Sequence, residues 1–198
     1  MTADPATTWI ALLRAVNVGG RKVEMARLRA LLGQQPGLSG VRTYIASGNV
    51  FFQAPTGPGR GREPEPERQR KELTQRLESC MEAEFGFRIP AVLRTEAEFA
   101  ADLEAAPFHD RAPAPDERFS LLFTDGQLEG ALEPRVSPKG DWEIVGVHGG
   151  TAYLIWHLID GRPPANPGPA LEKSLGVQAT GRFFHTCAKI LAAARKPG

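Results

Sequence analysis

Residues 9–16 read Trp-Ile-Ala-Leu-Leu-Arg-Ala-Val, and this stretch decides the fold. Seven of the eight residues are apolar, which is typical of a strand that is covered on both faces and lies in the centre of a sheet. The turn-forming residues Asn17 to Gly20 follow and end the strand. From residue 23 onward the apolar residues recur at helical spacing, so the sequence predicts a first helix directly after the first strand.

Two further strands and a second helix extend this pattern. The β-rich runs 41–45 and 50–53 flank Ser47-Gly48-Asn49, which predicts a hairpin. After a Pro- and Gly-rich loop at 54–66, the spacing predicts a helix over 67–85 and a strand over 89–94. The order β-α-β-β-α-β is that of the ferredoxin-like split βαβ unit. We therefore expect residues 8–95 to form an N-terminal ferredoxin-like half.

The second half of the chain has a related but less regular pattern. Its predicted elements, in chain order, are a helix at 96–105, a strand at 119–124, one short helix near 128–132, a hairpin of strands 141–148 and 151–158, and a closing helix at 179–195. We expect residues 96–196 to form a C-terminal half of order αβ(α)ββα. The predicted fold class is α+β, with two ferredoxin-like halves whose antiparallel sheets carry helices packed on one face.

The composition argues against several classes of protein. The chain has 198 residues, with 24 Lys and Arg against 23 Asp and Glu, so its formal net charge is +1. A dedicated nucleic-acid binder usually carries a strong basic excess, and this balance argues against nucleic acid as a partner. No apolar run approaches the ~20 residues that cross a membrane, and residues 1–8 do not read as a signal segment. We expect a cytoplasmic protein without membrane contact, and the sequence indicates no particular protein partner.

The predicted topology brings polar residues together at one end of the first sheet. The first and third strands of this unit are antiparallel neighbours, so the end of the first strand lies beside the start of the third. The start of the first helix lies at the same end, and its free backbone N–H groups favour an anion. We predict a pocket for a phosphate, a carboxylate or a developing oxyanion of a small metabolite, formed by Arg14, Asn17, Gly19, Gly20, Ser47, Gly48 and Asn49.

Two other interpretations stay open. In the structural one, the glycines are ordinary turn residues, Asn17 and Asn49 link two loops by hydrogen bonds, and Arg14 forms a packed ion pair. In the second functional one, the chain is a non-enzymatic interaction module that binds protein or single-stranded nucleic acid on an open sheet face. That surface would present Phe51 to solvent, since RNA-recognition modules of this topology stack bases on such aromatics.

The sequence identifies no catalytic residue and leaves open whether the protein is an enzyme. Gly19-Gly20 lacks the Gly-Lys-Ser/Thr of a phosphate-binding P-loop, and no Gly-x-Ser-x-Gly elbow is present. The four histidines lack metal-ligand spacing, and Cys80 and Cys187 lie on apolar helix faces. We therefore predict neither a metal site nor a cofactor.

The motifs at 13–20 and 42–50 together resemble those of the domain of unknown function 1697 family. Further matches are Phe85-Gly-Phe87, Pro90, Val92 to Thr95, Pro107-Phe108, Leu171 to Lys173 and Leu175-Gly176. The resemblance implies a two-part α+β fold of ferredoxin-like halves in a small cytoplasmic bacterial protein, and it implies no established reaction.

Two departures from the family pattern stand out. The family usually has glycine where this chain has Ala15, and its C-terminal helix usually opens with Arg-Asn-Trp. Here Arg182 is kept, but Phe183 and Phe184 replace the Asn and Trp. Because phenyl rings cannot form the lost hydrogen bonds, we expect Arg182 to hold a carboxylate of the protein, with Glu172 as the candidate partner.

Overall fold

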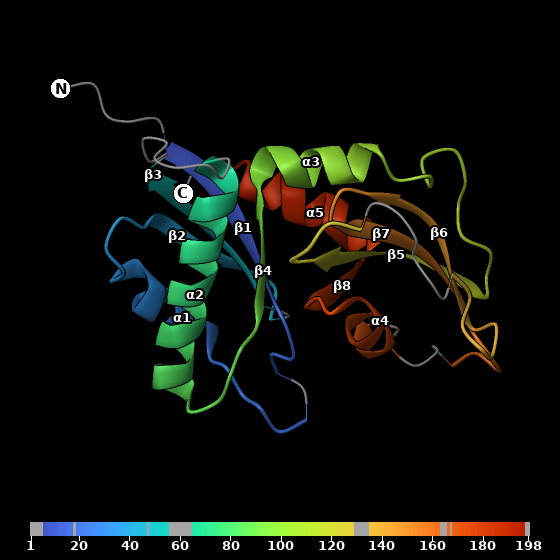
Figure 1. Cartoon of the computed structure of the whole chain (residues 1–198), viewed down its shortest axis with the longest axis horizontal. Coiled ribbons are helices and arrows are strands. Elements are labelled where there is room, and N and C mark those ends of the chain that lie inside the picture. The colour runs from blue at the N-terminus through green and yellow to red at the C-terminus, as the bar shows by residue number, and fades with distance from the viewer. Residues whose placement is uncertain are drawn as a thin grey trace. The chain divides into compact units, whose positions relative to one another are not determined.

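The structure is a computed structural model that describes residues 6–17, 19–46, 48–55, 65–128, 135–162, 166 and 168–196. It divides into two compact units, one of residues 1–99 with 192–198 and one of residues 100–191. The elements of the first unit, in chain order, are β1 (Ala6–Leu13), α1 (Met25–Gly33), β2 (Ser39–Tyr44), β3 (Asn49–Pro55), α2 (Glu65–Phe85), β4 (Ala91–Thr95) and the start of α3 (Glu96–Glu104) (Figure 1).

The first unit has the predicted ferredoxin-like topology. Its four strands form an antiparallel sheet in the order β2-β3-β1-β4, so β1 and β3 are its central strands, as the apolar run at 9–16 indicated. The register pairs Leu12 with Asn49 and Ile10 with Phe51. Strand β1 ends at Leu13, three residues earlier than the apolar run suggested, because the chain turns at Ala15, where φ is +54°.

The core of the first unit lies between one face of this sheet and the helices α1 and α2. Residues of alternate positions in β1, such as Trp9 and Ala11, cluster with Leu28 of α1 and with Leu77 and Met81 of α2. The i, i+4 spacing of Leu77 and Met81 places both side chains on the same helix face. Burial of this apolar surface is the main force that fixes both helices on the sheet.

The second face of the same sheet is not open at its centre. Ile10 and Leu12 of β1 are fully buried, and Phe51 of β3 is only 2% exposed. The guanidinium carbon of Arg42 lies over the Phe51 ring, 5.4 Å from the ring centroid. The sequence did predict that the helices α1 and α2 share one face. Phe51 is not presented to solvent, as the interaction-module interpretation requires it to be.

The second unit contains a sheet of the same strand order. Its elements are the rest of α3, β5 (Glu117–Thr124), β6 (Trp142–His148), β7 (Thr151–His157), α4 (Gly168–Leu175), β8 (Ala179–Phe183) and most of α5 (Phe184–Ala194). The sheet is antiparallel with the order β6-β7-β5-β8, which repeats the arrangement of the first unit strand by strand. The predicted α+β class with two antiparallel sheets is confirmed.

The C-terminal region differs from the prediction. Ala179 to Phe183 form the strand β8, paired with β5, and the helix begins only at Phe184. Cys187 and Ile190 are fully buried, as helical spacing predicted, but Phe183 is 37% exposed, so its place in the helical pattern was accidental. Pairing with the edge of β5 decides the conformation of these five residues, and a single sequence does not show that partner.

The structure also contains a helix that the sequence did not indicate. In α4, Pro169 stands in the first turn, where a missing N–H leaves no helical hydrogen bond unmade, and Leu171 is buried against Leu122 and Ala179. The short helix expected near 128–132 is absent at Leu128, and residues 129–134 lie outside the described part. Residues 56–64 of the predicted long loop also lie outside the described part.

No helix among the described residues is long and apolar enough to span a bilayer.

Candidate functional site

The structure brings the described members of the predicted site together at one end of the first sheet. Because β1 and β3 are antiparallel, the loop after β1 meets the start of β3, and the backbone N–H of Leu13 donates to the carbonyl of Gly48 at 2.7 Å. The loops that follow β1 and precede β4 lie at the same end (Figure 1), where the Arg14 N–H donates to the Pro90 carbonyl at 2.8 Å. Ser47 lies outside the described residues.

Asn17 links two loops through both atoms of its side-chain amide. Its Nδ2 donates to the carbonyl of Ala46 at 2.8 Å, and its Oδ1 accepts the backbone N–H of Val23 at 2.9 Å. These contacts tie the hairpin loop to the segment that leads into α1. They support the structural interpretation of Asn17, whose φ of +57° is one that asparagine tolerates better than most residues.

Asn49 is buried, with 0% of its surface exposed. Its Nδ2 donates to the carbonyl of Tyr44 at 3.0 Å, which closes the loop between β2 and β3. A side chain with no exposed surface offers no atom to a ligand from solvent. The observed contact therefore gives Asn49 a role in holding the hairpin.

Gly48 is required both by its backbone conformation and by its surroundings. Its φ is +77°, and a Cβ at this position would lie 2.8 Å from the Cβ of Leu13 and 3.2 Å from the Cγ2 of Val16. Real Cβ atoms essentially never approach carbon so closely. The hairpin tip can pack against β1 only if residue 48 has no side chain.

Gly19 and Gly20 differ from Gly48 because nothing crowds them. Their φ values are +59° and +82°, and no heavy atom lies within 4 Å of the position that a Cβ would take. Both residues are exposed. Their backbone is therefore accessible to a ligand, as the sequence-based hypothesis requires.

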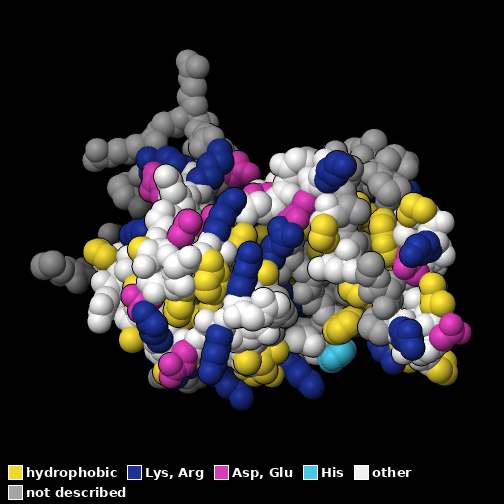
Figure 2. Space-filling model, turned by 90° about the horizontal axis from the view of Figure 1, so that it is seen from below, with side chains coloured by type: hydrophobic (Ala, Val, Ile, Leu, Met, Phe, Trp, Pro, Cys, Tyr) yellow, Lys and Arg dark blue, Asp and Glu magenta, His cyan; other side chains and the backbone are white. Residues whose placement is uncertain are grey.

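Two cations follow this exposed backbone directly in the chain. Arg21 and Lys22 are exposed and Arg14 is partly buried, and the guanidinium carbon of Arg21 lies 5.7 Å from the centroid of the Phe87 ring. Figure 2 shows a row of Lys and Arg side chains across the first unit, on the face seen from below. The sequence places Arg21 and Lys22 near the helix start, and we did not include them in the predicted site. Their position directly after Gly20 is the signal that could have identified them.

The N-terminus of α1 completes this end of the sheet. The helix begins at Met25, its N-cap residue Glu24 makes no side-chain capping bond, and its first turn contains no acidic residue. The first N–H groups of a helix lack intrahelical partners and carry a partial positive charge. Together with Arg21 and Lys22 they make this end attractive to an anion.

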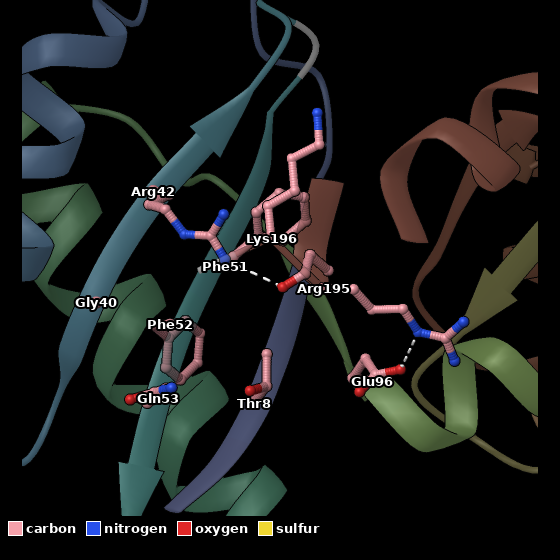
Figure 3. Close-up of a pocket in the computed structure, with 10 residues that line it drawn as sticks. Thr8, Gly40, Arg42, Phe51, Phe52, Gln53, Glu96, Arg195 and Lys196 are labelled. Carbon is pink, nitrogen blue, oxygen red and sulfur yellow. Dashed lines mark hydrogen bonds and ion pairs between the residues drawn. The ribbon is translucent and has the colours of Figure 1, made fainter. Parts of the chain in front are cut away.

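A cavity of about 290 Å³ lies on the second face of the same sheet, also within the first unit (Figure 3). It is bounded by Thr8, Gly40 and Gln53 of the sheet and by residues 194–196. The Arg195 Nε donates to the Glu96 Oε1 at 2.7 Å, and Figure 3 shows these two side chains turned toward each other and away from Arg42.

Arg42 joins this face to the end of α5. Its Nη1 donates to the carbonyl of Ala193 and its Nη2 to the carbonyl of Ala194, each at 3.0 Å. The last carbonyls of a helix lack intrahelical partners and favour a cation, so Arg42 caps α5. The register Arg42 to Phe51 places the side chain on this face. Its partners are 151 and 152 residues away along the chain, and no sequence pattern indicates them.

A buried carboxylate organises one end of the second unit. Asp102 of α3 is 4% exposed. Its Oδ2 accepts the hydroxyl of Thr151 at 2.8 Å, and its Oδ1 lies 3.0 Å from the His148 Nδ1. The Tyr153 hydroxyl donates to the Asp102 carbonyl at 2.8 Å, and burial raises the pKa of this hydroxyl. These bonds anchor the β6–β7 hairpin to α3, which gives the cluster a structural role.

Arg182 lies in β8 rather than at the start of the closing helix. Its Nη1 donates to the Thr180 Oγ1 at 2.9 Å and to the Gly181 carbonyl at 2.8 Å, and burial lowers its pKa to about 10. The Glu172 Oε1 accepts the backbone N–H of Ala179 at 2.7 Å. The expected ion pair between Arg182 and Glu172 stays a prediction.

Within the described part of the chain, no group of three or more His, Cys, Asp or Glu side chains is placed to hold a metal ion.

Comparisons with known proteins give a family and a fold. A family model described as "Protein of unknown function (DUF1697)" matches residues 6–153. A comparison with curated proteins gives no match. A solved structure described as that of the conserved bacterial protein SP0830 from Streptococcus pneumoniae is similar over 97% of this chain and 100% of its own, with a TM-score of 0.63 and 24% identity. At that identity the likeness concerns the fold alone.

Proposed function

Because this chain belongs to the DUF1697 family, whose description assigns no activity, we propose its function from the geometry of its own residues: it binds a small anionic molecule at the end of β1. The observation that carries the proposal is the exposed backbone of Gly19 and Gly20, which lies beside two exposed cations and an uncapped helix start. Backbone N–H groups, side-chain cations and a helix dipole that meet at one place are the usual components of an anion site.

The residues of this end divide into two groups. Gly19 and Gly20 let a ligand approach the backbone, while Arg14, Arg21 and Lys22 supply positive charge. Asn17, Gly48 and Asn49 hold the loops in place through the contacts described above, so the ligand depends on them without touching Asn49. Ser47 belongs to the proposal by its position in the hairpin loop. No described group at this end is activated as a nucleophile or base, and the proposal is therefore one of binding.

The interaction-module alternative receives less support. It rests on Phe51 as an outward aromatic on an open sheet face, and Phe51 is 2% exposed beneath the Arg42 guanidinium. A base cannot stack on a ring whose face is already occupied by an arginine.

Anion titration tests the proposal. Binding heats would be measured with sodium phosphate and sodium citrate against sodium chloride at equal, low ionic strength, because salt screens exposed charges. We expect the double variant Arg21→Gln/Lys22→Gln to weaken phosphate or citrate binding about tenfold, since each exposed charge contributes up to about 1 kcal/mol and about 1.4 kcal/mol corresponds to a factor of ten.

The matched control is Lys139→Gln, which removes an exposed lysine from the second unit and is expected to bind like the parent. Equal affinity of the double variant and the parent would show that the anion does not bind at the end of β1.

A further inference from the structure

We propose a second anion site in the first unit, on the face of the sheet that α1 and α2 do not cover. It would bind a small molecule that carries a phosphate group. The site is a cavity of about 370 Å³, at the lower end of the roughly 300–1,000 Å³ that small-molecule pockets occupy. It adjoins the cavity of Figure 3, with which it shares Arg42, Phe51 and Lys196. Its lining residues are Arg29, Arg42, Thr43, Tyr44, Phe51, Ala193 and Lys196.

Arg42 is the fixed point of this site. Its two Nη atoms are held by the carbonyls of Ala193 and Ala194, and the guanidinium lies over Phe51. Two of the five N–H donors of an arginine are occupied in this way, but neutral carbonyls do not cancel its charge. The cavity therefore has a positive charge that is held in place before any ligand arrives, and such positioning lowers the entropy cost of binding.

Arg29 and Lys196 add two cations from separate segments. The Arg29 Nη1 donates to the Thr43 Oγ1 at 2.7 Å. This bond holds the guanidinium of Arg29, which lies in α1, against β2. Since the Thr43 oxygen accepts this bond, its own hydrogen is left to donate elsewhere. Lys196 is exposed and has no ionic partner among the described residues, and Figure 3 shows it pointing away from the Arg195 side chain.

The charges of the lining select the class of ligand. Three cations and two hydroxyl-bearing residues, Thr43 and Tyr44, face the cavity, and none of its lining residues in the described part of the chain is an aspartate or glutamate. The nearby Glu96 belongs to the adjoining cavity and is engaged by Arg195. A multiply charged anion matches this lining better than a single carboxylate, and the N–H donors of Arg42 and Arg29 that these bonds do not use suit phosphate oxygens.

Calorimetry with inorganic phosphate as the probe tests this site, with sodium acetate at equal ionic strength as the singly charged comparison. We expect Lys196→Gln and Arg29→Gln each to weaken phosphate binding about five- to tenfold, because each removes one charged donor. Arg42 is left intact in this experiment because its substitution would release the end of α5.

The variant Lys22→Gln separates this site from the one at the end of β1. It is matched to Lys196→Gln because each variant replaces one exposed lysine of the first unit by glutamine. A phosphate site that Lys196→Gln weakens and Lys22→Gln leaves unchanged supports the cavity, whether or not Lys22→Gln weakens a separate phosphate site at the end of β1. Unchanged affinity in both Lys196→Gln and Arg29→Gln overturns it, and so does acetate binding as tightly as phosphate. Loss confined to Lys22→Gln overturns the cavity and supports the site at the end of β1.

Discussion

Ala15 occupies a backbone conformation that suits glycine better. Its φ is +54°, in the left-handed region, where a Cβ costs roughly 1–2 kcal/mol. Glycine, which lacks a Cβ, adopts this φ without that cost. In this chain the strained turn is held by its neighbours, among them Asn17 with its two loop-bridging bonds.

We therefore predict that Ala15→Gly stabilises the protein. Relief of the strain is partly offset by the greater freedom of glycine in the unfolded chain, about 0.4–1 kcal/mol, which leaves a net gain of about 0.5–1 kcal/mol. Urea unfolding followed by circular dichroism measures the change.

The comparison variant is Gly48→Ala, which adds the same methyl group at a φ of +77° but directly against Leu13. It should lose at least about 1–3 kcal/mol through strain and overpacking. An unfolding midpoint of Ala15→Gly below that of the parent would show that the Ala15 side chain makes packing contacts worth more than the strain.

At the scale of elements, the start of β5 is fixed by one carboxylate. The Glu117 Oε2 accepts the backbone N–H of Ala114 at 3.1 Å and pairs with the Arg111 guanidinium. The Ala114 bond first, and then Arg111, lower the Glu117 pKa below its ordinary value of 4.5. The loop at 111–116 thus closes on the first residue of the strand.

This lowered pKa predicts a pH dependence of stability. A carboxyl group whose pKa is lower in the folded than in the unfolded state stabilises the fold above the ordinary pKa and loses that effect as the pH falls through the folded pKa. We expect Glu117→Gln to lower the unfolding midpoint at pH 7, and the difference from the parent to shrink as the pH falls below about 4.5.

Thermal unfolding between pH 7 and pH 3 measures this difference, with the exposed Glu104→Gln as the control. A Glu117→Gln deficit of constant size over that range would contradict the assignment to the ionised carboxylate.

The elements also show how far the sequence alone can go. The central strand at 9–16 and the hairpin around residue 48 were predictable because burial on both faces and positive φ leave strong local patterns. The predicted topology also brings residues 17–20 to the same end of the sheet as the hairpin loop at residues 47–49. The strand β8 was missed because its pairing with β5 is a tertiary contact, and the same holds for Arg42, whose partners come from the far end of the chain.

At the scale of the whole molecule, each unit contains one thiol. Cys80 of α2 is partly exposed in the first unit, and Cys187 of α5 is fully buried in the second. Burial raises the pKa of both, that of Cys187 from 9.0 to about 12. The thiolate is the reactive form of cysteine, so the raised pKa of each thiol lowers its reactivity in the folded protein. The reaction rate of each cysteine therefore reports on the folding of the unit that contains it.

We predict that Cys187 reacts with an aromatic disulfide reagent far more slowly in the native protein than in the unfolded chain, because its side chain is fully buried and burial raises the pKa of its thiol. Cys80 should react first under native conditions. Single variants Cys80→Ser and Cys187→Ser assign the two rates, and native reaction of Cys187 at the rate of an unfolded thiol would contradict its burial.

The return of residues 192–198 to the first unit has a consequence for biosynthesis. A ribosome releases the strands and helices of residues 6–95 early, yet the carbonyls of Ala193 and Ala194 that Arg42 binds are made only after residues 100–191 of the second unit. At elongation rates of about 5–20 residues per second, the nascent first unit waits several seconds with that arginine unengaged. Its final hydrogen bonds form only after translation of the second unit is complete.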